Sequence, residues 1–499
     1  MLFASSEFLF YFLPASLFIF HIARNLWGGN AAMRMSVAAS LFFYGWWNPY
    51  FLLLIFVSLG VNFTATRALI TKPSKLVLSL VLAFNLALLG YFKYRNFFLE
   101  NMDFIFNGNA DAFGSLGTIF IPLGISFYTF QQIALLLDAQ DGAVEEAPDL
   151  LEYCQFILFF PQLIAGPIVL FRELSTQFKN LARNNGVGLA LFGPGLMVFI
   201  LGLFKKICLA DNIAPFADAA FNAHESITLL EAWAGSLAYM LQLYFDFSGY
   251  SDMAVGLGLM FGFRLPLNFD TPYIARNMVD FWKRWHMTMT RFFMMYLYTP
   301  LALSLSRYGL KNFRHGIIIF LLSVAVPTMV TFLLSGLWHG AGWTFIAFGA
   351  VNGIGLIAVH VWKEMNLPRL PMLLGWGLTM LCALVSFVYF RAESLSMAHN
   401  MLAAMVSPQA LIMPGFLESL ATQLGLESRA LPMLASGTYA VKCFVWVTTL
   451  GVLSIVMPNW AKTYEDIKPS WGVAFCAVLL GALVIGWLDK PQTFLYFQF

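Results

Sequence analysis

The chain is a succession of apolar runs separated by short polar turns. A helix needs about 20 predominantly apolar residues to cross the hydrocarbon core of a membrane. Runs close to this length are Phe8–Ile22, Met35–Trp47, Tyr50–Thr66, Leu76–Phe92, Val187–Phe204, Ile227–Phe245, Ile317–Leu334, Trp343–Trp362, Leu373–Phe390, Tyr439–Met457 and Val473–Trp487. They predict an all-α polytopic integral membrane protein with roughly 10–12 transmembrane helices, and re-entrant and interfacial helices besides.

Composition excludes several classes of protein. Hydrophobic residues make up 60% of the chain and charged residues 11%, whereas globular domains contain about 25% charged residues. The net charge of +2 leaves no basic excess that could neutralise nucleic-acid phosphates, so we expect no nucleic-acid partner. The cysteines are odd in number and lie mostly in apolar runs, which favours neither disulfides nor a metal site. We expect no metal and no permanently bound cofactor.

The loops between the runs are short, and their charges suggest an orientation. The longest extramembrane stretches are Asn96–Gly117, Gln140–Asp149, Phe171–Asn185 and Ser407–Ser436. Each is too short for an independent domain, so residues 1–499 are expected to form a single membrane-embedded domain. The first loop carries Arg24 and Arg34, the second no basic residue, and the third Lys72 and Lys75. The positive-inside rule then places the N-terminus outside the cytoplasm, although the basic pair after the fourth run opposes it.

Two apolar stretches contain Pro and Gly residues, which can interrupt a regular membrane helix. These stretches are Ile121–Tyr128 and Phe159–Pro167. Irregular backbone at membrane depth persists only where protein or a water-filled cavity satisfies it, so both are candidates for re-entrant elements that line a tunnel. A pair of ordinary proline-kinked spans is the alternative.

The first candidate for chemistry is His339, at the end of the run Phe332–Gly340. An ionisable residue inside a membrane is costly and therefore a functional hypothesis by default. Gly336, Gly340 and Gly342 surround it, and the missing side chains would let backbone, water or a thin substrate approach the imidazole. The alternative is a core histidine that a neighbouring carbonyl group satisfies.

Two carboxylates interrupt the apolar sequence at Tyr244–Met253. Asp246 and Asp252 need hydrogen-bond partners, because burying an unpaired charge is prohibitive. Ser251 and Asp252 stand where helix N-caps belong, before a glycine-rich helix over Ala254–Gly262, so we favour a structural role at a helix junction. Roles as general bases or in a proton relay remain open.

The segment Asp280–Arg291 predicts an interfacial amphipathic helix with a cationic face. Lys283, Arg284 and Arg291 fall on that face, and His286 lies at its border. The ordinary explanation is a basic belt that contacts anionic lipid. The sharper one is that these residues, at the cytosolic mouth, attract the phosphates of a donor such as coenzyme A, since arginine suits bidentate phosphate contacts.

Several of these motifs together resemble a known family. They are Phe160–Pro167, Gln242–Ala254, Phe281–His286 and Gly336–Gly340, with Phe42–Trp47, Gly90–Tyr94 and Phe494–Phe499 in the same order along the chain. The combination is similar to the membrane-bound O-acyltransferase family, and most of all to its bacterial subgroup that acetylates alginate and other exopolysaccharides.

The resemblance implies acyl transfer inside a central tunnel, with His339 as catalytic base and acid. Asn352, Asp246, Asp252 and Trp338 would line the tunnel or orient the substrates. The implied donor is cytosolic acetyl-CoA, and the implied acceptor is an extracytoplasmic polysaccharide. A periplasmic partner of the SGNH-hydrolase-like type would complete the transfer, and membrane lipid would surround a multi-pass protein of the bacterial inner membrane.

One departure from the family pattern concerns a second histidine, which the family commonly has in the following helix. Asn352 stands at that position, and asparagine cannot titrate. A two-histidine mechanism would therefore require His286. Two alternatives remain: D-alanyl transfer to teichoic acid from a carrier-protein thioester, and, in a different class, a secondary transporter that relays protons through Asp and His.

Overall fold

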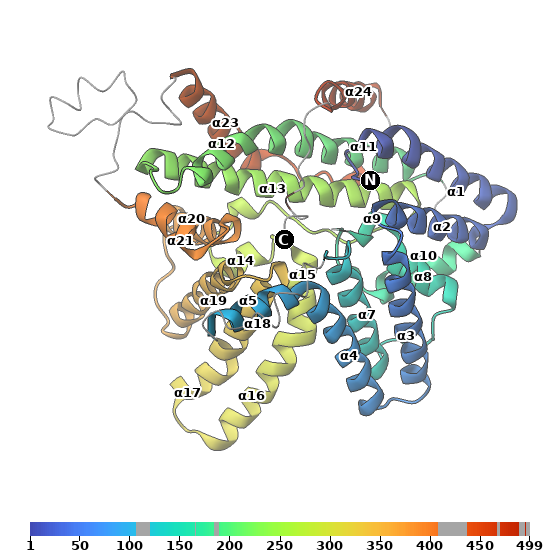
Figure 1. Ribbon diagram of the computed structural model, residues 1–499, viewed down its shortest axis with the longest axis horizontal. Helices are drawn as coiled ribbons and strands as arrows, with labels where there is room; N and C mark the ends of the chain where they lie inside the picture. Colours follow the sequence, from blue (N-terminus) through green and yellow to red (C-terminus); the bar gives the residue numbers. More distant parts are fainter. Residues whose placement is uncertain are drawn as a thin grey trace. The chain divides into compact units, whose positions relative to one another are not determined.

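The computed structural model describes residues 1–105, 120–164, 166–183, 189–407, 437–466, 470–488 and 495. Every regular element in these ranges is a helix (Figure 1), which confirms the all-α prediction. Two of the expected extramembrane stretches, Asn96–Gly117 and Ser407–Ser436, lie mostly outside the described residues. The same holds for the terminal motif Phe494–Phe499.

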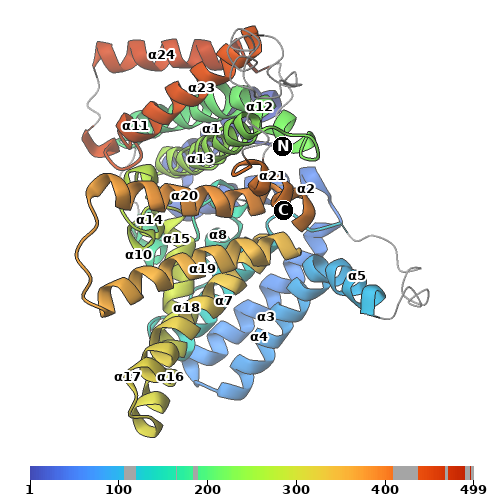
Figure 2. The same ribbon diagram turned by 90° about the vertical axis from the view of Figure 1, so that its left-hand side faces the viewer.

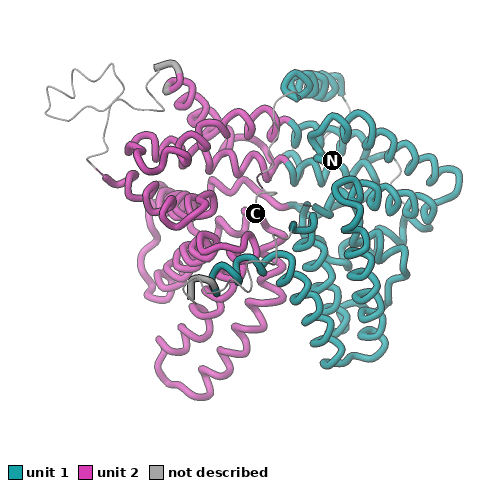
Figure 3. Tube along the Cα trace, viewed as in Figure 1, with its two compact units in different colours: residues 1–203, 250–267, 460–490 teal, residues 204–249, 268–459, 491–499 magenta. Residues whose placement is uncertain are grey.

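The chain forms two compact units, shown in separate colours in Figure 3. Unit 1 comprises residues 1–203, 250–267 and 460–490, and unit 2 comprises residues 204–249, 268–459 and 491–499. Both units are therefore assembled from separate parts of the sequence. That the whole chain acts as one membrane-embedded domain stays a prediction.

Unit 1 is a group of helices of very different lengths. Its helices are α1 (Leu13–Trp27), α2 (Gly29–Trp47), α3 (Phe51–Thr71), α4 (Lys75–Leu89), α5 (Arg95–Ile105), α7 (Ile125–Gln140), α8 (Leu150–Leu158), α9 (Phe160–Leu163), α10 (Phe171–Ala182), α11 (Phe192–Leu203) and α24 (Trp471–Ile485). Figures 1 and 2 both show α3 and α4 side by side, and both helices pack on α7.

Unit 2 holds the remaining helices apart from α13, which belongs to both units. They are α12 (Asp211–Asn222), α14 (Met278–Trp282), α15 (Met287–Phe293), α16 (Thr299–Asn312), α17 (Gly316–Phe320), α18 (Val326–His339), α19 (Trp343–Glu364), α20 (Met372–Arg391), α21 (Leu395–Ala404) and α23 (Gly437–Val456). A π-helical segment, Phe204–Ala210, precedes α12.

Seven helical segments of the described chain are long and apolar enough to cross a membrane. They are Phe8–Trp27, Phe51–Thr71, Lys75–Met102, Phe192–Asn222, Gly316–His339, Trp343–Glu364 and Met372–Arg391, and Val441–Val456 and Trp471–Ile485 are shorter apolar helices. The protein is thus a multi-pass integral membrane protein. The expected runs in α2 and α13 are also helical, but their polar residues keep them below the hydropathy of the seven.

Both Pro- and Gly-containing stretches interrupt the helices of unit 1. Gly124 has φ +67°, and a Cβ there would lie 2.6 Å from the carbonyl oxygen of Leu163, so this turn requires glycine. It leads directly into α7, which is buried over nearly its whole length. In the second stretch, the helical conformation is interrupted at Phe159, which lies between α8 and the one-turn helix α9. The prediction of irregular backbone is confirmed for both stretches, and a tunnel lining stays a prediction.

The expected helix break at Tyr244–Met253 is wrong. Helix α13 runs without interruption over 32 residues, from Leu229 to Met260. Ser251 and Asp252 therefore lie inside the helix and do not cap one. The helix can continue because Asp246, inside it, forms a buried ion pair. Its carboxylate therefore does not need the free N–H groups of a helix N-terminus as partners.

The expected continuous helix over Asp280–Arg291 is also wrong. The chain leaves the helical path between α14 and α15, and His286 adopts a left-handed conformation (φ 43°, ψ 52°). The reason lies in a neighbouring segment, whose main chain competes for the hydrogen bonds of the helix. The N–H of Met287 donates to the Asn268 carbonyl at 2.9 Å, and the N–H of Asp270 donates to the Arg284 carbonyl at 2.9 Å.

Helices α18 and α19 approach each other backbone to backbone at two glycines. A Cβ on Gly336 would lie 2.1 Å from the Phe345 carbonyl oxygen, and a Cβ on Gly349 would lie 2.3 Å from the Phe332 carbonyl oxygen. Small residues at helix contacts allow this close packing in membranes. A Cβ on Gly340 would overlap the Phe345 ring at 2.0 Å. Of the approaches expected at the glycines near His339, Gly336 thus admits the backbone of α19, and Gly340 admits the Phe345 ring.

This packing predicts opposite effects for two glycine substitutions. Gly349→Ala should lower the free energy of unfolding by about 1–3 kcal/mol, as overpacking does. Gly377→Ala in α20 should leave it unchanged or raise it by about 0.5–1 kcal/mol, because no atom lies within 4 Å of the added methyl group. The unfolding midpoint of the detergent-solubilised protein measures both. Equal shifts in the two variants would contradict the backbone contact.

Candidate active site

His339 is the last residue of α18, and only 7% of its surface is exposed. Its imidazole lies among aromatic rings, with centroid distances of 4.8 Å to Trp338, 5.2 Å to Phe390 and 5.7 Å to Phe348. The helix ends here because Gly340 is extended (φ −162°, ψ 151°). The carbonyl groups at a helix C-terminus carry partial negative charge and stabilise a cation. The position combines an apolar surround with a helix end that favours an imidazolium.

A second imidazole lies beside that of His339. His286 is completely buried, and its ring centroid lies 6.1 Å from that of His339. Its Nδ1 is 3.0 Å from Oδ1 of Asn268, and that oxygen also accepts from the N–H of Thr288 at 3.3 Å and from its hydroxyl at 2.8 Å. A backbone N–H can only donate, so this amide atom is the oxygen and Nδ1 of His286 carries the hydrogen.

The remaining ring nitrogen of His286 is left with a lone pair. Among the residues that the structure describes, none makes a hydrogen bond to this buried Nε2. Burial lowers the pKa of His286 to about 3, because the charged ring would lose its hydration. The ring is therefore a neutral acceptor at physiological pH. The sequence placed His286 at the edge of a cationic face, and the structure places it beside His339.

The left-handed backbone of His286 is uncommon for a residue with a side chain. Such conformations cost free energy and persist where the surroundings determine them, often at functional sites. Here the side chain of Asn268 holds the His286 ring, and its carbonyl holds the next residue, Met287. The sequence does not single out Asn268 as a site residue, because no motif distinguishes it from other loop asparagines.

Asn352 is completely buried on α19, one turn after Phe348. Its Oδ1 accepts from the indole N–H of Trp282 at 3.2 Å, and its Nδ2 donates to the Phe348 carbonyl at 2.8 Å. The Trp282 ring lies 6.4 Å from the Phe348 ring. Asn352 thus fixes aromatic rings near His339, in keeping with the orienting role predicted for it.

The residues expected on a common cationic face do not share one. Lys283 is exposed, whereas His286 is buried. Arg284 is tied to its own loop: its Nε donates to Asp280 at 2.8 Å and its Nη1 to the Asp270 carbonyl at 3.2 Å. The expected cationic face assumed an unbroken helix over Asp280–Arg291. Because the chain turns between α14 and α15, the helical wheel does not give the relative positions of these residues. A donor-binding role for Lys283, Arg284 and Arg291 stays a prediction.

A buried ion network surrounds Asp246. Lys206 lies 2.8 Å from its Oδ1 and also pairs with Asp211, and the backbone N–H of Leu495 donates to its Oδ2 at 3.4 Å. The side chains of Lys206 and Asp246 are each 3% exposed. The network supports the anchoring role predicted for Asp246. Lys206 was not predicted, because a lysine that follows an apolar run commonly lies at the membrane surface, where its charge reaches water. Asp252 lies in the part of α13 that belongs to unit 1.

The two histidines of unit 2 provide groups suited to proton transfer. His339 lies at the end of a helix, and His286 is a fixed, neutral acceptor beside it. Within the described part of the chain, no three His, Cys, Asp or Glu side chains come together as metal ligands. The geometry suits general acid–base chemistry on a hydroxyl group.

Comparison with known proteins identifies the family. A family model described as MBOAT, membrane-bound O-acyltransferase family, matches residues 143–397. The chain is also 35% identical, over its whole length, to a peptidoglycan O-acetyltransferase of Helicobacter pylori, of which the match covers 98%. The chain belongs to the membrane-bound O-acyltransferase family. It is therefore an O-acyltransferase, as the resemblance implied.

Other members of the family show the same similarity. The chain is 37% identical to a probable alginate O-acetylase of Pseudomonas putida, over 82% of this chain and 80% of that protein. It is 30% identical to a teichoic acid D-alanyltransferase of Streptococcus thermophilus, over 48% of this chain and 57% of that protein. The family match includes His339, His286, Asn352 and Asp246.

The ion network predicts a strong dependence on Lys206. Lys206→Met leaves two buried carboxylates without their cation, and removing one partner of a buried pair costs about 3–5 kcal/mol. The unfolding midpoint should fall sharply. The double variant Lys206→Met, Asp246→Asn should recover part of the loss. If Asp246→Asn instead abolishes acyl transfer with an unchanged midpoint, Asp246 takes part in the chemistry and is no mere anchor.

The fixed ring of His286 predicts a change in pH dependence. The pKa of about 3 keeps the wild-type ring neutral at every pH at which the enzyme is assayed. Asn268→Asp places a negative charge beside Nδ1 and raises the pKa of His286. Transfer should then decline as pH falls through the raised pKa and recover at higher pH. The pH profile of kcat/KM measures this, with the exposed Asn312→Asp as control. A profile equal to that of the control would exclude this role for His286.

Proposed function

We propose that the enzyme transfers acetyl groups from cytosolic acetyl-CoA for the O-acetylation of an extracytoplasmic polysaccharide. The proposal rests on the short distance between His339 and a second, neutral imidazole, that of His286. The names of the relatives support the acyl group and the acceptor class, since one is a peptidoglycan O-acetyltransferase and another a probable alginate O-acetylase.

In this mechanism His339 acts as general base and then as general acid. It takes the proton of the attacking hydroxyl group while the oxygen forms a bond to the thioester carbonyl carbon. The tetrahedral intermediate collapses, the carbon–sulfur bond breaks, and the imidazolium returns the proton to the leaving thiolate. The helix end beneath His339 stabilises the imidazolium between the two steps.

His286 contributes a positioning role in this scheme. Its Nε2 lone pair accepts a hydrogen bond and so orients the attacking hydroxyl group toward His339. It does not carry the proton, because burial disfavours its charged form. Asn352 and Trp338 keep the surrounding rings in place.

The cellular setting follows from the same proposal. The protein lies in the bacterial inner membrane with its N-terminus outside the cytoplasm, and the acetyl-CoA thioester enters a tunnel from the cytoplasmic side. The attacking hydroxyl group belongs to a periplasmic partner of the SGNH-hydrolase-like type, which carries the acetyl group as an ester. The partner then transfers it to a hydroxyl group of the sugar and regains its own hydroxyl group. The polysaccharide is of the alginate or cellulose-like exopolysaccharide class, or peptidoglycan.

A second candidate is D-alanyl transfer from a carrier-protein thioester to teichoic acid. The similarity to a teichoic acid D-alanyltransferase favours it, but that match covers about half of each chain. The transporter alternative has no support from the comparisons, because the family is one of acyltransferases.

The proposal predicts that His339→Ala abolishes turnover. Loss of general acid–base catalysis should lower the release of CoA from labelled acetyl-CoA by roughly a hundredfold or more. The assay uses purified protein in vesicles with a candidate periplasmic partner. His315→Ala removes an exposed histidine and is the matched control. Retention of turnover in the folded His339→Ala protein would remove this residue from the mechanism.

The same vesicles separate the two donors. Release of CoA by wild type and not by His339→Ala supports acetyl-CoA. Turnover only with an aminoacylated carrier protein would replace acetyl-CoA by a carrier thioester and leave the role of His339 intact.

A further inference from the structure

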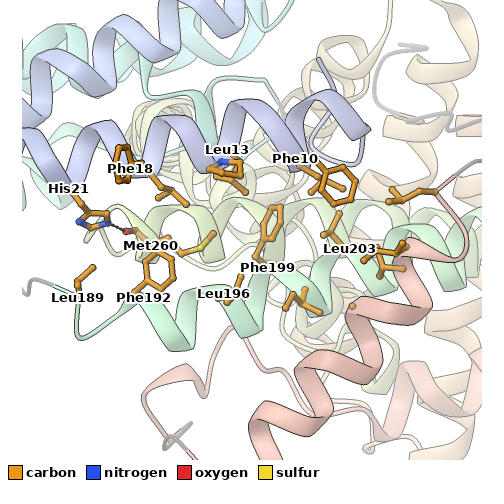
Figure 4. A pocket seen from close by; sticks show the side chains of 18 of the residues that line it. Phe10, Leu13, Phe18, His21, Leu189, Phe192, Leu196, Phe199, Leu203 and Met260 are labelled. Atoms are coloured by element: carbon orange, nitrogen blue, oxygen red, sulfur yellow. Dashed lines mark hydrogen bonds between the residues drawn. The ribbon is translucent and has the colours of Figure 1, made fainter.

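Unit 1 contains a long apolar groove, lined on opposite sides by α1 and α11 (Figure 4). Its volume is about 580 Å³. Along α1 and the π-helical segment Phe8–Phe12 that precedes it, the lining recurs every three to four residues from Leu9 to Asn25, so one face of this helical stretch forms a wall. Nothing in the acyl-transfer chemistry uses this groove.

The groove has one polar end and one apolar end. His21 and Asn25 line it at the C-terminal end of α1, and Figure 4 shows His21 near Met260 and Phe192, while Phe10 lies at the other end. The His21 ring is hydrogen-bonded to the Met260 carbonyl, 3.0 Å from Nε2. The rest of the lining is almost entirely hydrocarbon. A ligand that fits it is amphipathic, with one polar head and a long apolar tail.

The groove is exposed to the bilayer. Two of its walls are supplied by Phe8–Trp27 and Phe192–Asn222, which are candidate membrane spans. A third is supplied by the end of the shorter apolar helix α24, through Gly481, Val484 and Ile485. Several lining side chains are exposed, among them Phe18 at 67% and Leu196 at 40%. In a membrane, lipid reaches such a surface first.

The groove is long enough for an acyl chain. Its lining runs from Phe10 to Asn25, which is about 22 Å at 1.5 Å per residue. A hydrocarbon chain that lies along this length contacts apolar side chains over nearly its whole course.

Charge indicates the kind of lipid. Arg24 lies one turn beyond His21 on α1, and no acidic residue lines the groove. Basic residues at the end of a membrane helix attract anionic headgroups. Arg34, in the second turn of α2, is a further basic residue near the connection between α1 and α2.

We propose that the groove between α1 and α11 binds one acyl chain of an anionic phospholipid, with the headgroup beside His21, Arg24 and Asn25. Such a lipid fills a gap between two spans and stabilises unit 1, because a ligand that binds only the folded state raises its stability.

The test uses full-length protein in nanodiscs with phosphatidylglycerol or phosphatidylcholine that carries a photoreactive group on one acyl chain. Peptide mapping should locate the phosphatidylglycerol label on α1 and α11. Leu196→Trp places an indole in the groove and should remove most of this label. Leu53→Trp, on the exposed face of α3, is the matched control and should keep it.

The headgroup is tested separately, in case a groove variant fails to fold. Arg24→Gln should reduce labelling by phosphatidylglycerol about fivefold, the effect of one basic residue at an anionic surface, and leave labelling by phosphatidylcholine unchanged. Phosphatidylglycerol should also raise the unfolding midpoint of wild type more than phosphatidylcholine does. Equal labelling of all spans, no effect of either variant, or cross-links between two copies of the chain at α1 would each overturn the proposal.

Discussion

Inside a membrane, polar groups cannot turn to bulk water, so each must find its partner within the protein. Two interactions in unit 2 show how this constraint shapes the helices. One oxygen of Asn268 accepts three hydrogen bonds from His286 and Thr288 and thereby holds a helix break open. Lys206 neutralises Asp246 in place, and α13 continues past it. Whether a helix ends near a polar residue or continues past it depends on where the hydrogen-bond or ion-pair partner of that residue lies.

This constraint explains which parts of the fold could be predicted from the sequence. Apolar runs of membrane length predicted the all-α multi-pass fold, because the length requirement acts on each run alone. The breaks at Gly124 and Phe159 were also predictable, since proline and glycine act locally. The course of the chain at Asp246 and at His286 was not. There the outcome depends on Lys206 and Asn268, which are distant in sequence and carry no signal in their own surroundings.

The candidate site divides in the same way. His339 was identified because a histidine at the end of an apolar run is rare and costly in a membrane. The glycines near it were expected to admit backbone, water or a thin substrate. The structure shows backbone of α19 at Gly336 and the Phe345 ring at Gly340. The sequence indicates that something comes close to a glycine, and the structure identifies the group. His286 was recognised as a possible second histidine at the border of a cationic face, and the structure shows it completely buried.

The two imidazoles are chemically distinct because their surroundings differ. His339 lies at the end of a helix, where backbone carbonyl groups favour its charged form. His286 precedes a helix and gives its only N–H to Asn268, so it gains no such stabilisation and stays neutral. In the proposed scheme the proton is carried by His339 alone, and His286 only accepts a hydrogen bond. Asn352, at the position where a second histidine was expected, instead accepts a hydrogen bond from Trp282 and donates one to the Phe348 carbonyl. The second imidazole near His339 comes from the segment between α14 and α15.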